Sequence, residues 1–274
     1  MRLTKYLLKT VQGALIGLGA VLPGISGGVL SVVFGIYQPA MELLANPKKY
    51  WRSHLPILLP AFIGAIIGFM GVANLLASLL SRYPDQSVCV FVGLILGMLP
   101  SLLKEAGKQG IAKGSYTALL AATVIVLFLL CGLNASSVTI APNFAWYVFC
   151  GFCLALSLIA PGMSFSTLLM PLGLYTPFVD GIGHLTPQVI LPAGLGSLIA
   201  FFCLPKLVNR LFEFHYSVTF HAIVGVVIAA TAVTVPYQAL TSSVKGGIQN
   251  GLCMVGGIIC SLLLDRYNSR VQVR

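Results

Sequence analysis

Charged side chains are scarce in this sequence. Only 8% of its 274 residues are Asp, Glu, Lys or Arg, against roughly 25% in an ordinary soluble domain. The six acidic residues and four histidines are scattered along the chain, whereas phosphoester chemistry needs a nucleophile with acid–base partners or a metal cluster. The composition therefore argues against an enzyme, and we expect no catalytic residue, metal or cofactor.

Long apolar runs dominate what is present. Hydrophobic residues make up 58% of the chain, and many runs approach or exceed the roughly 17 to 25 residues that a spanning helix needs. The runs show no strict alternation of apolar and polar residues, so helices are favoured over an outer-membrane barrel. The sequence predicts an all-α polytopic membrane protein.

The net charge of +10 does not indicate a nucleic-acid partner. The Lys and Arg residues stand in short groups between apolar runs rather than along one face, which is typical of membrane topology signals. The basic N-terminus with Arg2, Lys5 and Lys9 resembles the start of a signal peptide, but no convincing cleavage site follows it, so we expect it to be retained.

The sequence contains an internal repeat. Several residues recur 138 positions later, and beyond the segment 46–54 the offset becomes 132. The matches at 138 pair Gly13, Leu18, Pro23, Gly24, Ser26, Leu30, Gly35, Tyr37 and Pro39 with Gly151, Leu156, Pro161, Gly162, Ser164, Leu168, Gly173, Tyr175 and Pro177. Two copies, 1–135 and 139–274, therefore fill the chain as one integrated transmembrane domain. The extra residues of the first copy fall in a basic loop around 46–54.

Each copy is predicted to contain a re-entrant helical hairpin and three transmembrane helices. The apolar run 11–22 would be roughly 18 Å long as a helix, against roughly 30 Å of hydrocarbon. Pro23 and the glycine-rich stretch after it permit a reversal, after which 29–44 runs back. The hairpins are expected at 11–44 and 144–178, and the spans at about 55–80, 88–103, 115–133, 188–205, 219–235 and 248–264.

The basic residues give an orientation to this arrangement. With both termini in the cytoplasm, fourteen Lys and Arg residues are cytoplasmic and only Arg82 and Lys245 face outward, as the positive-inside rule requires. A hairpin and three spans cross the membrane an odd number of times, so the second copy is inverted relative to the first. The alternative is that each Pro-Gly only kinks one long helix, which gives eight spans.

The two Pro-Gly tips are the predicted binding site. A half-helix that starts after such a break directs free amide N–H groups and a positive dipole end at its surroundings, which suits a phosphate or carboxylate. The alternative is a tight turn that merely caps the next helix. The candidate residues are Pro23, Gly24, Ser26, Gly27, Gly28, Pro161, Gly162, Ser164, Ser166 and Thr167.

Four residues beyond the tips complete the predictions. Glu42 and Asp180 match at the offset of 138, and a carboxyl near hydrocarbon has a raised pKa through desolvation. They are candidates for carrying a coupling proton or cation, unless they are simply interfacial. Tyr37 and Tyr175 are expected to be interfacial anchors, and the alternative is that they line the ligand path.

These motifs resemble a known family. The string from Gly13 to Gly28 and the segment 34–37 resemble the opening of the bacterial polyprenyl-phosphate transporter family, formerly a membrane family of unknown function. The segments 160–164 and 173–175 resemble its second motif, and the similarity extends over nearly the whole chain. Gln38 departs from the pattern, where an acidic residue is expected.

The resemblance implies a function in lipid transport. The substrate would be undecaprenyl phosphate, the lipid carrier of cell-wall and surface-glycan synthesis, returned by a flippase across the bacterial cytoplasmic membrane. The residues alone leave two alternatives open, a secondary transporter of another small anion and a membrane enzyme or scaffold.

Overall fold

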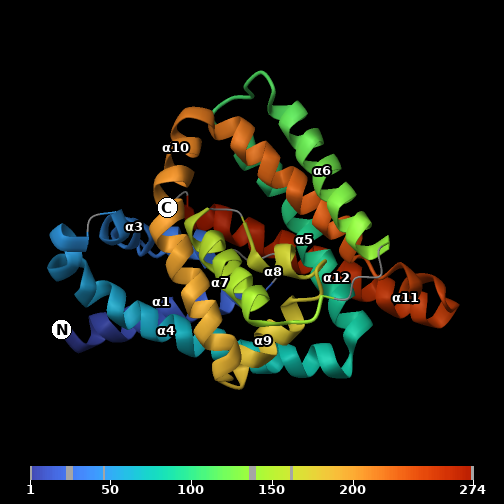
Figure 1. Ribbon diagram of the computed structural model, residues 1–274, viewed down its shortest axis with the longest axis horizontal. Coiled ribbons are helices and arrows are strands. Elements are labelled where there is room, and N and C mark those ends of the chain that lie inside the picture. Colours follow the sequence, from blue (N-terminus) through green and yellow to red (C-terminus); the bar gives the residue numbers. More distant parts are fainter. Residues whose placement is uncertain (1, 23–26, 46, 136–139, 161–162, 273–274) are drawn as a thin grey trace. The chain divides into compact units, whose positions relative to one another are not determined.

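Every regular element in the part of the chain that the structure describes is an α-helix (Figure 1). This computed structural model describes residues 2–22, 27–45, 47–135, 140–160 and 163–272. The helices are α1 (Arg2–Val21), α2 (Gly27–Val33), α3 (Tyr37–Ala45), α4 (Pro47–Arg82), α5 (Pro84–Ala106), α6 (Ser115–Ala135), α7 (Phe144–Ile159), α8 (Phe165–Leu169), α9 (Tyr175–Gly183), α10 (Pro187–Thr234), α11 (Tyr237–Thr241) and α12 (Val244–Gln272). The predicted all-α class is confirmed.

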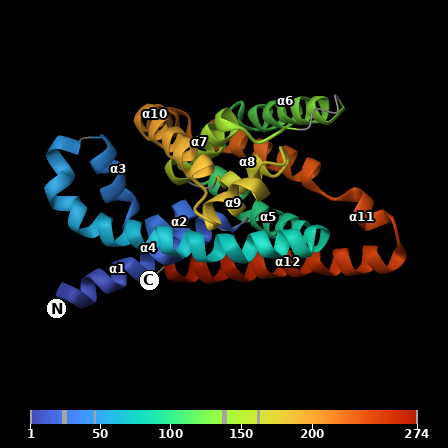
Figure 2. The same cartoon turned by 60° about the horizontal axis from the view of Figure 1, so that its bottom comes forward.

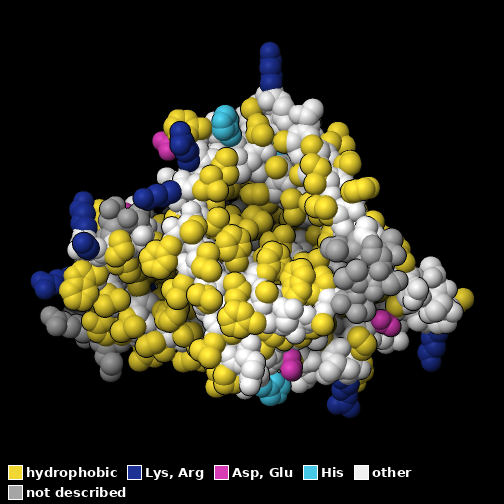
Figure 3. All heavy atoms as spheres, in the orientation of Figure 1, with side chains coloured by type: hydrophobic (Ala, Val, Ile, Leu, Met, Phe, Trp, Pro, Cys, Tyr) yellow, Lys and Arg dark blue, Asp and Glu magenta, His cyan; other side chains and the backbone are white. Residues whose placement is uncertain are grey.

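Among the described residues, five helices are long and apolar enough to cross a membrane, namely α4, α5, α6, α10 and α12. The six predicted spans correspond to these five helices because α10 contains 188–205 and all but the last residue of 219–235. As one straight helix, its 48 residues would extend roughly 72 Å, more than twice the hydrocarbon thickness. Its backbone leaves the helical conformation at His215, with φ −136° and ψ 41°. The chain is a multi-pass membrane protein, and Figure 3 shows apolar side chains over most of the visible face.

The basic segment before the first long span is helical rather than the predicted loop. α4 already begins at Pro47 and includes Lys48, Lys49 and Arg52. Proline fits the first position of a helix, and Lys and Arg have high helix propensity. The helix therefore begins several residues before the apolar run that predicted it.

The limb that follows each break is divided in two, whereas a single returning limb was expected. α2 and α3 are separated at Gly35, which has φ +65°, and α8 and α9 are separated at Gly173, which has φ +69°. After α2, the Gly35 amide donates to the Val32 carbonyl at 3.0 Å and the Ile36 amide to the Ser31 carbonyl at 2.8 Å. This is the Schellman closure, in which a glycine with positive φ ends the helix.

The helices form two compact units, and each unit combines segments from both halves of the sequence. The first contains Met1–Ala77, Pro142–Ser166 and Tyr175–Asn209, and the second contains Ser78–Ala141, Thr167–Leu174 and Arg210–Arg274. In the second unit, α5 and α12 lie side by side (Figures 1 and 2). A Cβ atom on Gly257 of α12 would overlap the Val90 carbonyl of α5, so these two backbones are in close contact.

In the first unit, glycines bring helix backbones together in the same way in both halves of the chain. α1 packs against α4, and α7 packs against the beginning of α10, at positions where a Cβ atom would overlap a backbone carbonyl oxygen. The glycine and the residue whose carbonyl it meets are Gly13 and Ala61, Gly64 and Thr10, Gly151 and Ala193, and Gly196 and Val148. The third and fourth pairs are the first and second displaced by the two repeat offsets.

Candidate functional site

The residues predicted to bind an anion flank two breaks, one between α1 and α2 and one between α7 and α8. Gly27 and Gly28 are the first residues of α2 and are buried. Ser164 immediately precedes α8, and Ser166 and Thr167 lie within it. Five of the predicted residues lie outside the described ranges: Pro23, Gly24, Ser26, Pro161 and Gly162.

The second break has three buried hydroxyl groups. The Oγ atoms of Ser164 and Ser166 lie 2.6 Å apart and form a hydrogen bond. The Thr167 side chain is only 2% exposed, and its Oγ1 has no hydrogen-bond partner among the described residues. Leaving a buried polar atom unpaired costs about 1–3 kcal/mol. A ligand oxygen or a water at this place would remove that cost.

The first break has one buried hydroxyl that sequence analysis missed. Ser31 Oγ donates to the Gly28 carbonyl at 2.6 Å, within α2. Its match at the offset of 138 is Leu169, so nothing in the repeat pointed to it. The two breaks therefore differ in their polar groups as well as in sequence.

The helices that follow the breaks are short. α2 has seven residues and α8 has five, so each sums fewer peptide dipoles than the half-helix that was expected. The first amides of any helix still lack intrahelical acceptors. Attraction for an anion at these breaks would therefore rest on local N–H and O–H donors more than on a long helix dipole.

Two tyrosine hydroxyls connect each half of the chain to the break in the other half. Tyr37 donates to the Ile159 carbonyl at 2.9 Å, and Tyr175 donates to the Val21 carbonyl at 2.7 Å. Both donors and both acceptors are related by the same offset of 138. Tyr175 is only 2% exposed, so the prediction of an interfacial anchor was wrong for this residue; Tyr37 is half-buried.

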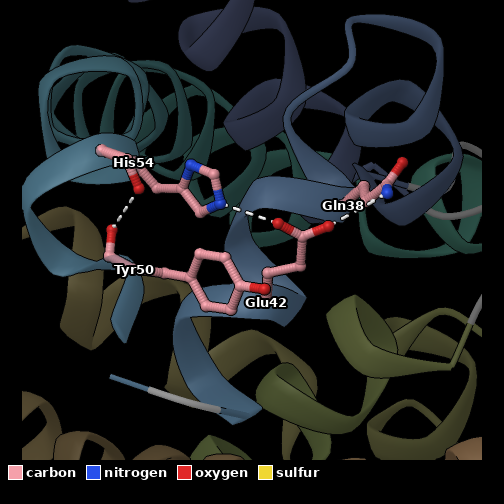
Figure 4. Close-up of polar contacts among 5 residues, drawn as sticks. Gln38, Glu42, Tyr50 and His54 are labelled. Carbon is pink, nitrogen blue, oxygen red and sulfur yellow. Dashed lines mark hydrogen bonds and ion pairs between the residues drawn. The ribbon is translucent and has the colours of Figure 1, made fainter. Parts of the chain in front are cut away.

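The Glu42 carboxylate is hydrogen-bonded rather than isolated (Figure 4). Nε2 of His54 lies 2.7 Å from Glu42 Oε2, and Nε2 of Gln38 donates to Oε1 at 3.0 Å. The hydrogen bond with His54 has the largest effect on the pKa of Glu42, and that with Gln38 the next largest. Both lower this pKa below its ordinary value. Proton coupling was expected to depend on a carboxyl pKa raised by desolvation. The pKa of Glu42 is shifted in the opposite direction.

Asp180 also lies close to a histidine. Its Oδ1 is 3.3 Å from Nδ1 of His184, one helical turn further on, and both side chains are more than half exposed. An exposed pair of this kind contributes little to stability. The two matched acids therefore each have a histidine neighbour, but in different geometry.

Comparison with known proteins identifies the family. The profile of the undecaprenyl phosphate translocase-like family matches residues 2–113 and 102–250. The chain belongs to this family. It is 24% identical over 277 residues to a polyprenyl-phosphate transporter of Staphylococcus aureus, an alignment that covers 96% of this chain and 97% of that protein.

A second relative is a polyprenyl-phosphate transporter of Vibrio cholerae. It is 22% identical over 258 residues, which cover 86% of this chain and 80% of that protein. No solved structure matches the chain. The family and both relatives are named for transport and not for an enzymatic reaction.

Proposed function

We propose that this protein is a flippase that returns undecaprenyl phosphate across the bacterial cytoplasmic membrane for cell-wall and surface-glycan synthesis. The observation that carries the proposal is similarity over 96% of the chain to a protein named polyprenyl-phosphate transporter. The two breaks support it, because irregular backbone at membrane depth is tolerated where it is buried in protein or lines a polar cavity. Gly27, Gly28, Ser164 and Ser166, which flank the two breaks, belong to the same compact unit.

In the proposed mechanism, the phosphate headgroup lies between the two breaks. Backbone N–H groups at Gly27 and Gly28 and the hydroxyls of Ser164, Ser166 and Thr167 would donate to its oxygens, as they would to any oxyanion. Ser26 and the two Pro-Gly pairs would complete the site. The polyprenyl tail would stay in the hydrocarbon of the membrane, because moving apolar surface into a polar cavity gives no favourable free energy. Glu42 and Asp180 are the proposed carriers of a coupling proton or cation, and Glu42 would first have to lose its bond from His54.

The recurrence of backbone contacts supports the proposed architecture of two inverted repeats, 1–135 and 139–274. Equivalent glycines contact equivalent carbonyls. The two turns are also equivalent, because Gly35 and Gly173 both have a positive φ. The distribution of Lys and Arg supports an orientation of these repeats with both termini in the cytoplasm.

Cysteine labelling tests the proposed topology. In a background without the exposed Cys131, Cys203 and Cys260, an impermeant thiol reagent is expected to label Ala141→Cys from outside intact cells. Lys48→Cys and Lys108→Cys should be labelled only after the membrane is opened. All three positions are exposed on the protein, so a lack of reaction reports the side of the membrane and not burial. External labelling of Lys48→Cys would contradict the re-entrant hairpin.

Ligand-dependent stability tests headgroup recognition. Undecaprenyl phosphate is expected to raise the melting temperature of the purified protein more than undecaprenol does, by an amount equivalent to about 2–5 kcal/mol, because the phosphate makes one or two charge-assisted hydrogen bonds. Phosphatidic acid controls for a phosphate on another lipid, and inorganic phosphate tests the alternative of a small soluble anion. Equal stabilisation by the phosphate and the alcohol would mean that only the tail is recognised.

A further inference from the structure

Buried ends of α1 and α7 precede the two breaks. α1 ends at Val21 and α7 ends at Ile159, and the last carbonyls of any helix have no intrahelical partner. The proline two residues further on cannot continue the helix. In the second half, the Met163 amide, which would reach Ile159 in a continuous helix, instead donates to Ala160 at 3.3 Å. The Val21 and Ile159 residues are almost fully buried, so water is a poor substitute.

Tyrosine hydroxyls from the opposite repeat donate to the last carbonyls of these two helices. Tyr37 is 122 residues from Ile159, and Tyr175 is 154 residues from Val21. Each tyrosine is the first residue of its helix, α3 or α9, and follows the turn made by a glycine with positive φ. The recurring Gly-x-Tyr sequence therefore has one structural reason: the glycine ends the short helix, and the tyrosine that follows reaches the other repeat.

Tyr175 contacts the helix before the first break and the helix after the second. Its hydroxyl donates to the last carbonyl of α1. The centroid of its ring lies 5.9 Å from the ring centroid of Phe165, the first residue of α8. Phe165 is fully buried. It also packs against the rings of Phe178 and Phe69, with centroid separations of 5.9 Å and 6.1 Å. Hence one side chain connects the last residue of α1 with the first residue of α8.

We propose that Tyr37 and Tyr175 are positioning residues of the headgroup site, which hold the two breaks at the separation that a phosphate requires. The inference rests on the proposed function, because it assumes that both breaks contact one headgroup. The tyrosines do not touch the phosphate in this scheme. They act through the ends of α1 and α7, the helices that precede the two breaks.

Removing each hydroxyl tests this role. Tyr37→Phe and Tyr175→Phe keep the ring and its packing, and Tyr6→Phe, at an exposed position on α1, is the control. The readout is the ratio of apparent affinities for undecaprenyl phosphate and undecaprenol, measured on folded protein. We expect this ratio to fall about three- to tenfold in each of the two variants, the size expected for one hydrogen bond, and to stay unchanged in Tyr6→Phe.

The outcomes separate the two proposals. A residue that only stabilises the fold would lower the melting temperature without changing the affinity ratio, and an unchanged ratio in both phenylalanine variants would overturn the positioning role. If the wild-type protein binds undecaprenyl phosphate and undecaprenol equally well, the proposed headgroup site is contradicted. The proposed positioning role of the tyrosines is then contradicted as well. If Tyr175→Phe does not accumulate, the half-buried Tyr37 decides the question, since its replacement disturbs less of the core.

Discussion

Leucine in place of Gly24 or Gly162 is expected to abolish transport of undecaprenyl phosphate while the protein still reaches the membrane. Both glycines follow a proline at a predicted reversal, where a side chain restricts the backbone and obstructs a ligand. They lie outside the described residues; beside the first break, Val21, Gly27 and Gly28 are buried and Leu22 is half-buried.

The measurement is leaflet-resolved transport in proteoliposomes, with variants compared at equal protein content. Gly71→Leu is the matched control, because Gly71 lies on α4 with open space where a Cβ atom would be. Smaller losses are expected for Ser26→Ala and Ser164→Ala, consistent with about 0.5–1.5 kcal/mol for a neutral hydrogen bond and up to about twice that to an anion. Normal transport by both leucine variants would leave the Pro-Gly tips as structural turns.

The long helices were predictable because their signal is local. A run such as 88–103 contains enough consecutive apolar residues to identify a span, and α5 contains it with a few residues to spare at each end. The ends of α1 and α7 were also predictable, since a proline follows each within two residues and cannot continue the helix. The second break in each returning limb was less evident, because a single glycine only sometimes ends a helix.

The contacts around the site were not predictable from one sequence. The repeat showed that Tyr37 and Tyr175 are equivalent, but not that each binds the other half of the chain, since a hydrogen bond across more than 120 residues leaves no local pattern. Tyrosine is common at membrane interfaces, and that general preference led to the wrong location for Tyr175. Likewise, desolvation suggested a raised pKa for Glu42, whereas its hydrogen bonds to His54 and Gln38 lower it.

The second large effect is expected on stability, from an alanine substitution at one of two neighbouring glycines of α10. Gly196→Ala is expected to destabilise the protein, because its Cβ atom would overlap the Val148 carbonyl and crowd the Phe152 amide of α7. Both are backbone atoms that cannot turn aside, so α7 itself must move. Overpacking usually costs about 1–3 kcal/mol, and we expect the upper end of that range. The displaced α7 would also move Ile159 away from Tyr37, so transport should fall with stability.

Gly194→Ala is the internal control for this prediction. Gly194 has open space where a Cβ atom would be, and alanine favours a helix over glycine by up to about 1 kcal/mol, so this variant should be as stable as the wild type or more stable. Thermal unfolding in detergent measures both variants, and Gly64→Ala, the match of Gly196 in the first half, should behave like Gly196→Ala because it meets the Thr10 carbonyl. A Gly196→Ala protein that unfolds at the wild-type temperature would show that α7 and α10 are not in backbone contact.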